Sequence, residues 1–468
     1  KLKINVVGGC CGTTPEHLKC LVEKLRNVPQ NPRPQNSAPK LASAIQATSM
    51  LQEPRPFLIG ERLNTQGSRK FKDLILAEDY DSMLAIARQQ VENGAHGLDI
   101  CVALTERADE AATIRKVIKT QRYLEMGSRA VLLFTGVKVK GFRPAWWIGT
   151  AGLSVAKILE NMEIGHNVMH GQWDWMRDPK IHSTAWEWDN ASPSSQWKHS
   201  HNEIHHTFTN VLGRDNDLGY GILRVDEDQR WSPFFLFQPI WHVGNALLFE
   251  YSIAAYDLEL GGYLAKRKRM SEEEKAKFRA DAAEVVAKIK RQATKDYVVH
   301  PALAAATFTG SARHTLTANV VANLVRNVWT NTVIICGHFP PGIATFEKTS
   351  IEGETRGEWY LRQMLGSGNI SGSKAMHVMS GNLSHQIEHH LFPDMPSNRY
   401  AEISPQIRDL MERHDVPYVT GSFPKQVASV YWKVVELSLP NKVEGRRRRD
   451  IVRLSLKRAW KKKSLGRF

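Results

Sequence analysis

The sequence predicts a mainly α-helical protein with membrane-spanning helices, preceded by an α/β segment. Residues 231–249 and 327–346 contain no lysine, arginine, aspartate or glutamate. About twenty helical residues span about 30 Å, the thickness of the hydrocarbon core of a bilayer, so each stretch is long enough to cross a membrane. The first 120 residues instead alternate short apolar runs with helical patterns, which is typical of β/α folds.

The α/β segment contains three predicted strands, at residues 4–9, 56–60 and 98–102. Residues 15–26 have helical spacing, and residues 31–55 are rich in Pro, Asn, Gln and Ser, which indicates a linker. A second helix is predicted over residues 80–94, because apolar residues recur at helical spacing before Gly94: Met83, Leu84, Ala87 and Val91.

Two further stretches, residues 130–156 and 297–325, are apolar but are interrupted by charged side chains. Between the uncharged stretches lies a strongly charged segment, residues 266–295, in which Ser271 precedes three glutamates. Such a serine is a favourable helix N-cap, so this segment predicts a helix outside the membrane, as part of a cytosolic helical cap.

The net charge of +15 is concentrated in one place. Residues 441–468 carry twelve lysines and arginines against Glu444 and Asp450. A basic tail beside apolar segments predicts an anchor at a membrane surface or a solvated tail, and it does not indicate a nucleic-acid partner. The five cysteines are too scattered for a disulfide framework, which favours a reducing compartment.

The number and spacing of the histidines are the strongest indication of function in the sequence. Fifteen of the eighteen lie between residues 166 and 390. Three clusters each contain a pair at i and i+4, a spacing that puts both imidazoles on one side of a helix. The clusters are His166 and His170; His201, His205 and His206; and His385, His389 and His390.

This constellation predicts a metal site. Neutral imidazole suits iron, zinc, copper and nickel, and a zinc ion needs about four ligands. The three clusters offer eight histidines, which fit two six-coordinate iron ions better than one zinc ion.

The clusters and their flanks resemble the membrane fatty acid desaturases. The resemblance rests on KILENMEIGHNVMHGQWDWMRDP, SSQWKHSHNEIHHTFTNVLGRDNDLGYGI and NLSHQIEHHLFPDMPSNRY, and it covers residues 121–440. It is closest to actinobacterial acyl-CoA and linoleoyl-CoA desaturases. The third cluster also resembles the QxxHH box of front-end desaturases.

The resemblance implies a set of iron ligands. They are His166, His170, His201, His205, His206, His389 and His390. His385 and Gln386 compete for the first place in the third box. His338, in an uncharged stretch, is the expected additional ligand, and His242 is the alternative to it. Asp174, Asn202 and Glu388 are expected to orient imidazole N–H groups, while His182 and His199 are expected to lie outside the ligand set.

The implied activity is the O₂-dependent introduction of a cis double bond into a fatty acyl chain at a di-iron centre. Hydroxylation or epoxidation of the acyl chain is the alternative, because the same histidine boxes serve both. Seven tryptophans are expected either to line an acyl tunnel or to form an aromatic belt at the membrane interface: Trp146, Trp147, Trp173, Trp175, Trp186, Trp188 and Trp197.

The resemblance also implies partners and a location. The chain contains no HPGG haem motif, so a separate reductase or ferredoxin is expected to supply electrons. The expected substrate is an acyl-CoA or an acyl lipid, and membrane lipids are expected partners. The expected location is the bacterial cytoplasmic membrane, with the active site facing the cytoplasm. Acyl chain length, the carrier, the position of the double bond (Δ6 or Δ9) and the number of spans stay open.

Residues 1–118 resemble another family, cobalamin-dependent methionine synthase. INVVGGCCGTTPEH, in residues 1–30, is similar to the end of its homocysteine-binding barrel, where Cys10 and Cys11 would be vestigial zinc ligands. Residues 56–118 are similar to the start of its folate-binding (pterin) barrel. A (β/α)₈ barrel needs about 250 residues, so both barrels are incomplete. This segment favours a chimeric fusion over a methyltransferase, with the junction near residues 113–121.

Overall fold

The computed structural model describes residues 15–25, 39–42, 47–65, 67–102, 108–215, 217–444 and 446–464. The chain divides into two compact units, Lys1–Leu104 and Thr105–Phe468. Each unit is described by itself.

The first unit is a small α/β assembly. Strand β3 pairs in parallel with β4, and β1 pairs with β2 in the antiparallel sense. Leu63, Phe71, Ile75 and Ile86 form its buried core. The elements are α1 (Pro15–Leu25), β1 (Lys40–Ala42), β2 (Ala47–Ser49), β3 (Ile59–Asn64), α2 (Arg69–Leu76), α3 (Tyr80–Glu92) and β4 (Gly97–Cys101).

The predicted helices at residues 15–26 and 80–94 are confirmed as α1 and α3. The predicted strands at residues 56–60 and 98–102 correspond to β3 and β4, with β3 beginning later than expected. The predicted strand at residues 4–9 lies outside the described residues, as do Cys10 and Cys11.

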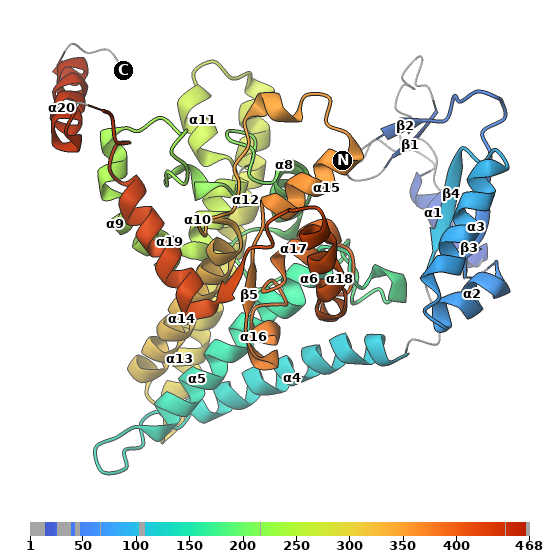
Figure 1. Cartoon of the computed structure of the whole chain (residues 1–468). Coiled ribbons are helices and arrows are strands. Elements are labelled where there is room, and N and C mark those ends of the chain that lie inside the picture. Colours follow the sequence, from blue (N-terminus) through green and yellow to red (C-terminus); the bar gives the residue numbers. More distant parts are fainter. Residues whose placement is uncertain are drawn as a thin grey trace. The chain divides into compact units, whose positions relative to one another are not determined.

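Long packed helices dominate the second unit: α4 (Ala108–Leu132), α5 (Pro144–Leu159), α12 (Glu272–Ala293), α13 (His300–Ala305) and α14 (Ala312–His338) (Figure 1). Helix α5 packs against both α4 and α14. Two glycines permit its close approach to α4, because a Cβ atom on Gly149 or Gly152 would collide with Leu132 or Ser128. The charged helix expected from the sequence is α12, where Ser271 and Glu274 form a capping box.

Helical segments of π type (i→i+5) lead into two histidine clusters, η1 (Glu160–His166) and η3 (His199–His205), and a third, η6 (Thr294–Val299), precedes α13. Such segments are frequent at functional sites. Strand β5 (Asn369–Ser371) pairs in parallel with β6 (Thr420–Ser422). The other longer helices are α9 (Gln238–Leu247), α10 (Phe249–Asp257), α11 (Leu260–Lys266), α15 (Arg356–Leu365), α18 (Tyr400–Arg413), α19 (Phe423–Leu437) and, in the basic tail, α20 (Arg448–Ser464). The shorter helices include α6 (Asn167–Met169), α7 (Ser194–Lys198), α8 (His206–Phe208), α16 (Lys374–Met379) and α17 (Gln386–Leu391).

The expected transmembrane fold is wrong for the described residues, among which no helix is both long and apolar enough to cross a membrane. Residues 231–249 do not form one helix: they divide among η5 (Pro233–Phe237), α9 and the start of α10. Helix α14 is long, but it buries polar side chains such as Asn323 and Arg326. The same finding contradicts the expected integral location in the bacterial cytoplasmic membrane.

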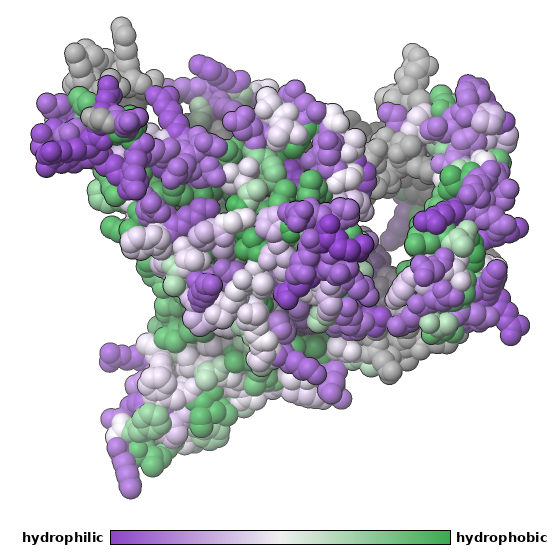
Figure 2. Space-filling model, viewed as in Figure 1, coloured by the Kyte–Doolittle hydropathy of each residue, from purple (hydrophilic) through white to green (hydrophobic). Residues whose placement is uncertain are grey.

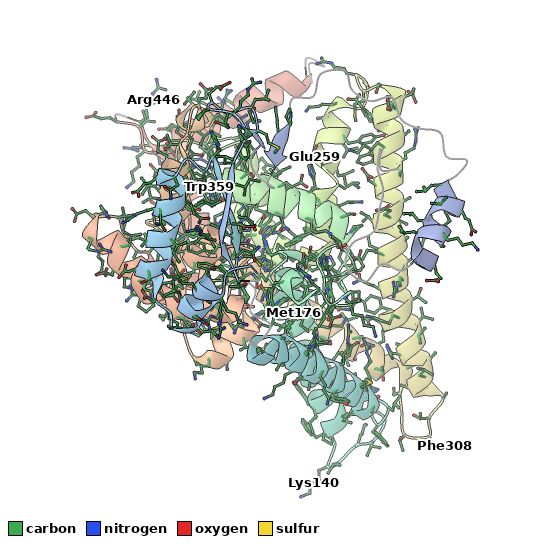
Figure 3. All side chains as sticks on the ribbon, turned by 90° about the vertical axis from the view of Figure 1, so that its right-hand side faces the viewer. Lys140, Met176, Glu259, Phe308, Trp359 and Arg446 are labelled. Atoms are coloured by element: carbon green, nitrogen blue, oxygen red, sulfur yellow. The ribbon has the colours of Figure 1, made fainter. Side chains whose placement is uncertain are left out.

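Apolar side chains are nonetheless exposed near the hairpins that join α4 to α5 and α13 to α14. Figure 2 shows hydrophobic residues gathered over this lower end of the helices, and Figure 3 shows Lys140 and Phe308 at the tips of the two hairpins. Phe308, Trp147 and Ile148 are among the exposed residues.

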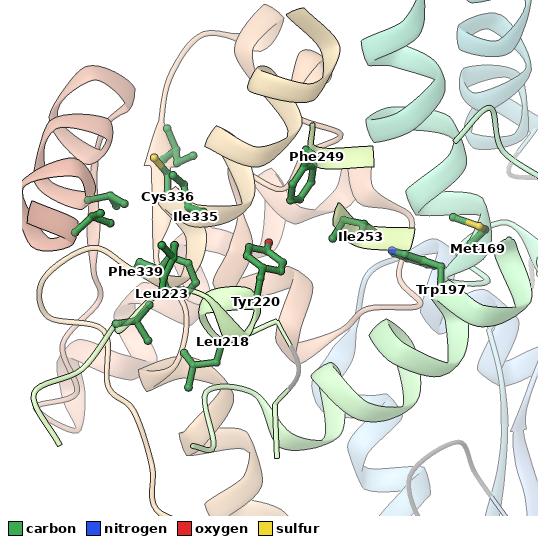
Figure 4. Close-up of a cluster of buried hydrophobic side chains, with 14 of the residues drawn as sticks. Met169, Trp197, Leu218, Tyr220, Leu223, Phe249, Ile253, Ile335, Cys336 and Phe339 are labelled. Atoms are coloured by element: carbon green, nitrogen blue, oxygen red, sulfur yellow. The ribbon is translucent and has the colours of Figure 1, made fainter. Parts of the chain in front are cut away.

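The largest apolar core of the second unit brings together segments that are far apart in the sequence. It joins Met169 and Trp197 to the 218–225 segment, to α10 and to the end of α14 (Figure 4). This core adjoins the first two histidine clusters through Met169 and Trp197, whereas the third cluster lies in α17, whose Ile387 and Leu391 belong to a separate apolar cluster.

Candidate metal centre

Four histidines from three segments converge inside the second unit. One nitrogen of each lies within 4.8 Å of the others, in the group His166, His170, His201 and His389. His166 ends η1, His170 follows α6, His201 lies in η3 and His389 lies in α17. We call these four residues the first histidine group.

A second histidine group contains His205, His338 and His390, again within 4.8 Å of one another, and all three are buried. His338 is the last residue of α14. Adjacent residues on an α-helix point about 100° apart, so His389 and His390 reach different groups from one turn. The second histidine cluster is also divided, because His201 belongs to the first group and His205 to the second.

His206 lies between the two groups. Its ring centroid is 4.7 Å from that of His170 and 4.5 Å from that of His390. Neither of its ring nitrogens has a hydrogen-bond partner, although the residue is buried. His206 is therefore positioned to serve either group.

Unpaired histidine nitrogens indicate whether these residues could bind metal ions. The Nε2 atoms of His170, His201, His205 and His389 are buried without a hydrogen-bond partner. Leaving a buried polar atom unpaired costs roughly 1–3 kcal/mol, so these atoms, three in the first histidine group and one in the second, favour a bound ligand in each group. The donor set, all imidazole, suits iron and its neighbours among the transition metals. The residues present fit a metal centre.

Two carboxylates, the buried Asp215 and the partly buried Asp217, hold the opposite side of two of these rings. Nδ1 of His205 lies 2.9 Å from Asp215 Oδ1, and Nδ1 of His201 lies 3.0 Å from Asp217 Oδ2. A carboxylate on Nδ1 fixes the tautomer and leaves Nε2 free to bind a metal. These two acids were not predicted from the sequence, because they lie in a loop after the second cluster, where acids are common.

Polar groups also hold three of the other rings. Nδ1 of His389 lies 3.2 Å from the hydroxyl of Tyr400, and Nδ1 of His390 lies 3.1 Å from Oε1 of Gln363. Nδ1 of His338 lies 3.4 Å from the carbonyl of Gly366. The orientation of the histidines is thus set by the surrounding protein.

Burial keeps most of the rings neutral, which is the metal-binding form. It lowers the pKa of His166 to about 4 and the pKa of His338 to about 3. The exception is His205: burial opposes its charged form, but Asp215 and Asp217 outweigh burial and raise its pKa to about 9. A metal ion binding at His205 therefore displaces a proton.

The structure distinguishes the two candidates for the first place in the third box. Nε2 of Gln386 lies 3.0 Å from Nε2 of His338, within the second histidine group. His385 instead stacks on His377, with ring centroids 4.7 Å apart, and lines a separate surface pocket beside Ser404 and Arg408. Gln386, not His385, lies among the histidines.

Two of the three residues expected to orient imidazoles lie near one: Oε2 of Glu388 is 3.9 Å from Nδ1 of His385, and Oδ1 of Asp174 is 3.7 Å from Nδ1 of His182. All three also make other contacts. Asp174 accepts hydrogen bonds from the amide and hydroxyl of Ser183, and Asn202 donates to the carbonyl of Met169. Glu388 accepts hydrogen bonds from Asn369 and Tyr418.

The histidines outside the expected set also lie apart from the two groups. His242 packs against Tyr431, His199 pairs with Glu203 at the surface, and His182 contacts Thr184.

A largely enclosed cavity of about 50 Å³ opens onto both histidine groups. His166, His201, His338 and Gln386 line it on one side. Of the seven candidate tryptophans, Trp188 and Trp197 line this cavity. The other apolar lining residues are Met162, Tyr220, Phe249, Ile253, Ile334 and Leu383, and polar groups are contributed by Asn161, Asn190, Asp217, Asp257 and Thr330.

The fold and the converging histidines define a helical protein with a candidate metal centre beside an apolar cavity. Comparison with known families matches residues 144–422 to the fatty acid desaturases. The chain is 49% identical over 367 residues to the NADPH-dependent stearoyl-CoA 9-desaturase of two Mycobacterium tuberculosis strains, covering 78% of this chain and 84% of the relative. This chain belongs to the fatty acid desaturase family and is a desaturase of the oxidoreductase class.

The N-terminal part matches a second family. Residues 60–131 match the pterin binding enzymes. The segment is 39% identical over 99 residues to methionine synthase of Mycobacterium tuberculosis, and 39% identical over 104 residues to methionine synthase of Mycobacterium leprae. These matches cover 8% and 9% of the two enzymes, so the similarity extends over only a short part of their length.

Proposed function

We propose that this chain uses O₂ to introduce a cis double bond into the acyl chain of an acyl-CoA, at two iron ions held by its histidines. The observation that carries the proposal is that two groups of buried histidines with unpaired nitrogens face one largely apolar cavity. An apolar cavity beside a metal centre suits a substrate without polar groups at the reacting carbons.

We assign the ligands from the same geometry. His166, His170, His201 and His389 would hold one iron, and His205, His338 and His390 would hold the other, with His206 between them. Gln386 would complete the second group or orient a ligand there. Bound iron supplies the redox chemistry that O₂ reduction requires, which amino-acid side chains alone lack.

The protein's own residues position the substrate and exclude water. Trp188, Trp197, Met162 and Leu383 would hold the acyl chain along the cavity wall, with two adjacent methylenes near the histidines. Holding reacting groups in place removes much of the entropic barrier, and a closed apolar wall prevents side reactions with solvent. Asp215 and Asp217 keep His205 and His201 in the metal-binding orientation.

The named relative supports the choice of carrier and position. It acts on stearoyl-CoA at carbon 9 and depends on NADPH. We therefore propose a long-chain acyl-CoA as substrate, a Δ9 product, and electrons that pass from NADPH through a separate reductase or ferredoxin-type donor.

The test combines metal analysis with product analysis. Purified full-length protein is expected to hold close to two irons per chain and to convert stearoyl-CoA, with NADPH and a reductase system, into a cis-monounsaturated acyl-CoA. His205→Ala is expected to lose iron and activity. His199→Ala is the matched control, because His199 lies in the same helical segment but is exposed and pairs with Glu203.

Two results would contradict the proposal. Iron content near zero in a folded protein would exclude the metal assignment. A hydroxylated or epoxidised product without a double bond would exclude desaturation and keep the same site for a different oxidation.

A further inference from the structure

Tyr220 has an unusual backbone conformation beside the cavity. Gly219, Tyr220 and Gly221 have φ values of 72°, 51° and 68°. A bulky residue rarely occupies this left-handed region, and such residues cluster at functional sites because the surrounding structure must impose them. Here the conformation turns the aromatic ring inward, with the hydroxyl on the side of Phe249 rather than Leu218 (Figure 4).

The hydroxyl of Tyr220 has no partner among the described residues. The side chain is only 8% exposed, and its oxygen is buried without a hydrogen bond. Tyr220 lines the cavity together with His166 and His201. A buried hydroxyl that aims into a cavity and has no partner there is available to a ligand or a water molecule.

Asp257, the last residue of α10, lines the same cavity. Its carboxyl group accepts a hydrogen bond from the hydroxyl of Ser192. The other acids near the histidines, Asp215 and Asp217, are bonded to His205 and His201. Asp257 is therefore the cavity acid that is not bonded to a histidine.

These polar groups make one wall of the cavity unsuitable for an acyl chain. A methylene group against them would leave the hydroxyl of Tyr220 without a partner and would offer the carboxyl of Asp257 no hydrogen bond beyond the one from Ser192. Water suits this wall, because a buried water needs several polar partners and about 10–15 Å³, and the cavity measures about 50 Å³. The apolar lining residues, among them Trp188 and Leu383, are left for the substrate.

The proposed reaction requires protons inside this cavity. In desaturation, one acyl –CH₂–CH₂– unit, one O₂, two electrons and two protons give one –CH=CH– unit and two waters. Two C–H bonds and the O–O bond break, while four O–H bonds and the second C–C bond form. The external donor supplies the electrons, and two of the four hydrogens in the waters come from solvent.

We infer that Tyr220 and Asp257 form a proton-donating pair on one wall of the histidine cavity, which delivers solvent protons for O₂ reduction. The inference rests on the proposed function. Asp257 passes a proton to the cavity and is reprotonated from solvent, and the Tyr220 hydroxyl relays a proton through a shared water without becoming a phenolate.

The charges around the pair agree with these roles. Burial raises the pKa of Asp257 to about 7, and the carboxylate of Asp217 adds to this effect, so its carboxyl holds a proton near neutral pH. Burial and the facing carboxylates of Asp217, Asp215 and Asp257 raise the pKa of Tyr220 well above its ordinary value. Tyr220 therefore keeps its hydroxyl proton and can act as a relay.

A matched pair of tyrosines allows a clean test. The hydroxyl of Tyr256 is also buried without a partner, and its ring packs edge-on against Tyr220 at 5.9 Å, but Tyr256 does not line the cavity. Tyr220→Phe and Asp257→Asn are expected to lower the desaturation rate at least tenfold with bound iron unchanged, and to enlarge the solvent deuterium isotope effect. Tyr256→Phe is expected to stay within twofold of the wild type.

Infrared spectroscopy of the metal-free protein gives a readout that does not depend on activity. The wild type is expected to show C=O bands of several protonated carboxyl groups near neutral pH, because burial also raises the pKa of Glu163 to about 8 and that of Glu160 to about 7, and Asp257→Asn is expected to remove one component in the difference spectrum. Tyr220→Phe is expected to shift this component, and Tyr256→Phe is expected to leave it in place.

Different results would contradict the proton-donating pair and the proposed function. If the wild type forms double bonds and Tyr220→Phe forms them as fast, or if Tyr256→Phe is equally impaired, the proton-donating pair is wrong and the proposed function stands. If the iron-loaded wild type forms no double bond, the proposed function fails, and the pair fails with it.

Discussion

Nδ1 of His205 lies 2.9 Å from Oδ1 of Asp215, and both side chains are almost completely buried, with exposed fractions of 1% and 0%. Asp215 also accepts hydrogen bonds from the backbone amides of Asn210 and Asp217. The carboxylate therefore joins the loop after the second histidine cluster to a candidate ligand of the second histidine group.

We predict that Asp215→Asn lowers iron affinity about 10- to 100-fold, which is the usual effect of removing a carboxylate that orients a metal-binding histidine. Isothermal titration or competition with a chelator measures the change. Glu203→Gln is the control, because Glu203 pairs with His199 at the exposed face of the same helical segment. Equal affinities for the wild type and Asp215→Asn would show that this contact does not orient a ligand.

The metal-free protein is predicted to lose stability below about pH 6.5. The pKa of His166 is lowered to about 4 and that of His338 to about 3, against about 6.5 in an unfolded chain. As pH falls below 6.5 the unfolded state takes up protons first, so the free energy of unfolding decreases, by roughly 3 kcal/mol for His166 alone by pH 4.

His205 contributes to the pH dependence of stability with the opposite sign. Its pKa is raised to about 9, so its contribution to stability is complete below pH 6.5 and is lost as pH rises through 9. Urea denaturation of the metal-free protein across this range measures both effects. Buried carboxyls with raised pKa values, such as Glu163 at about 8, act in the opposite sense, so the contribution of His166 is measured as the difference between the wild type and His166→Gln. The same pH dependence in both proteins between pH 6.5 and 4 would contradict a buried, neutral His166.

The histidine clusters could be predicted from the sequence because their spacing is local. An i, i+4 pair such as His166 and His170 defines its own geometry on a helix. The division of ligands between two groups could not be predicted, because it depends on how α14 and α17 meet in space. For the same reason, only tertiary packing shows that Gln386 rather than His385 lies beside His338.

The membrane spans were wrongly predicted because hydropathy counts charges and ignores where a helix ends. Residues 231–249 lack charged side chains, yet the chain leaves helical geometry at Leu248, which has φ −109° and ψ 26°. Helix α14 retains Arg326 and several asparagines in its buried face. The uncharged stretch 327–346 begins after Arg326 and continues beyond His338, where α14 ends, so only part of it is helical.

Arg326 and Glu250 form a buried ion pair with an N–O distance of 2.7 Å, and both are at most 4% exposed. We predict that Arg326→Met lowers the free energy of unfolding by about 3–5 kcal/mol, because it leaves the Glu250 charge buried and unpaired. The double variant Arg326→Met, Glu250→Leu is expected to recover a large part of this loss. Arg413→Met is the surface control, since the Arg413–Asp409 pair is mostly exposed. If Arg326→Met and Arg413→Met lower the free energy of unfolding equally, burial of the Glu250 charge is not the cause of the loss.

Gln386 and His385 allow the ligand assignment in the third box to be tested by a pair of adjacent variants. Gln386→Ala is expected to weaken iron binding, because its side chain lies 3.0 Å from Nε2 of His338. His385→Ala is expected to retain iron, because His385 faces a separate surface pocket and stacks on His377. Metal analysis of the two purified variants, with circular dichroism to verify folding, gives the comparison. Loss of iron from His385→Ala alone would reverse the assignment and require α17 to rotate when metal binds.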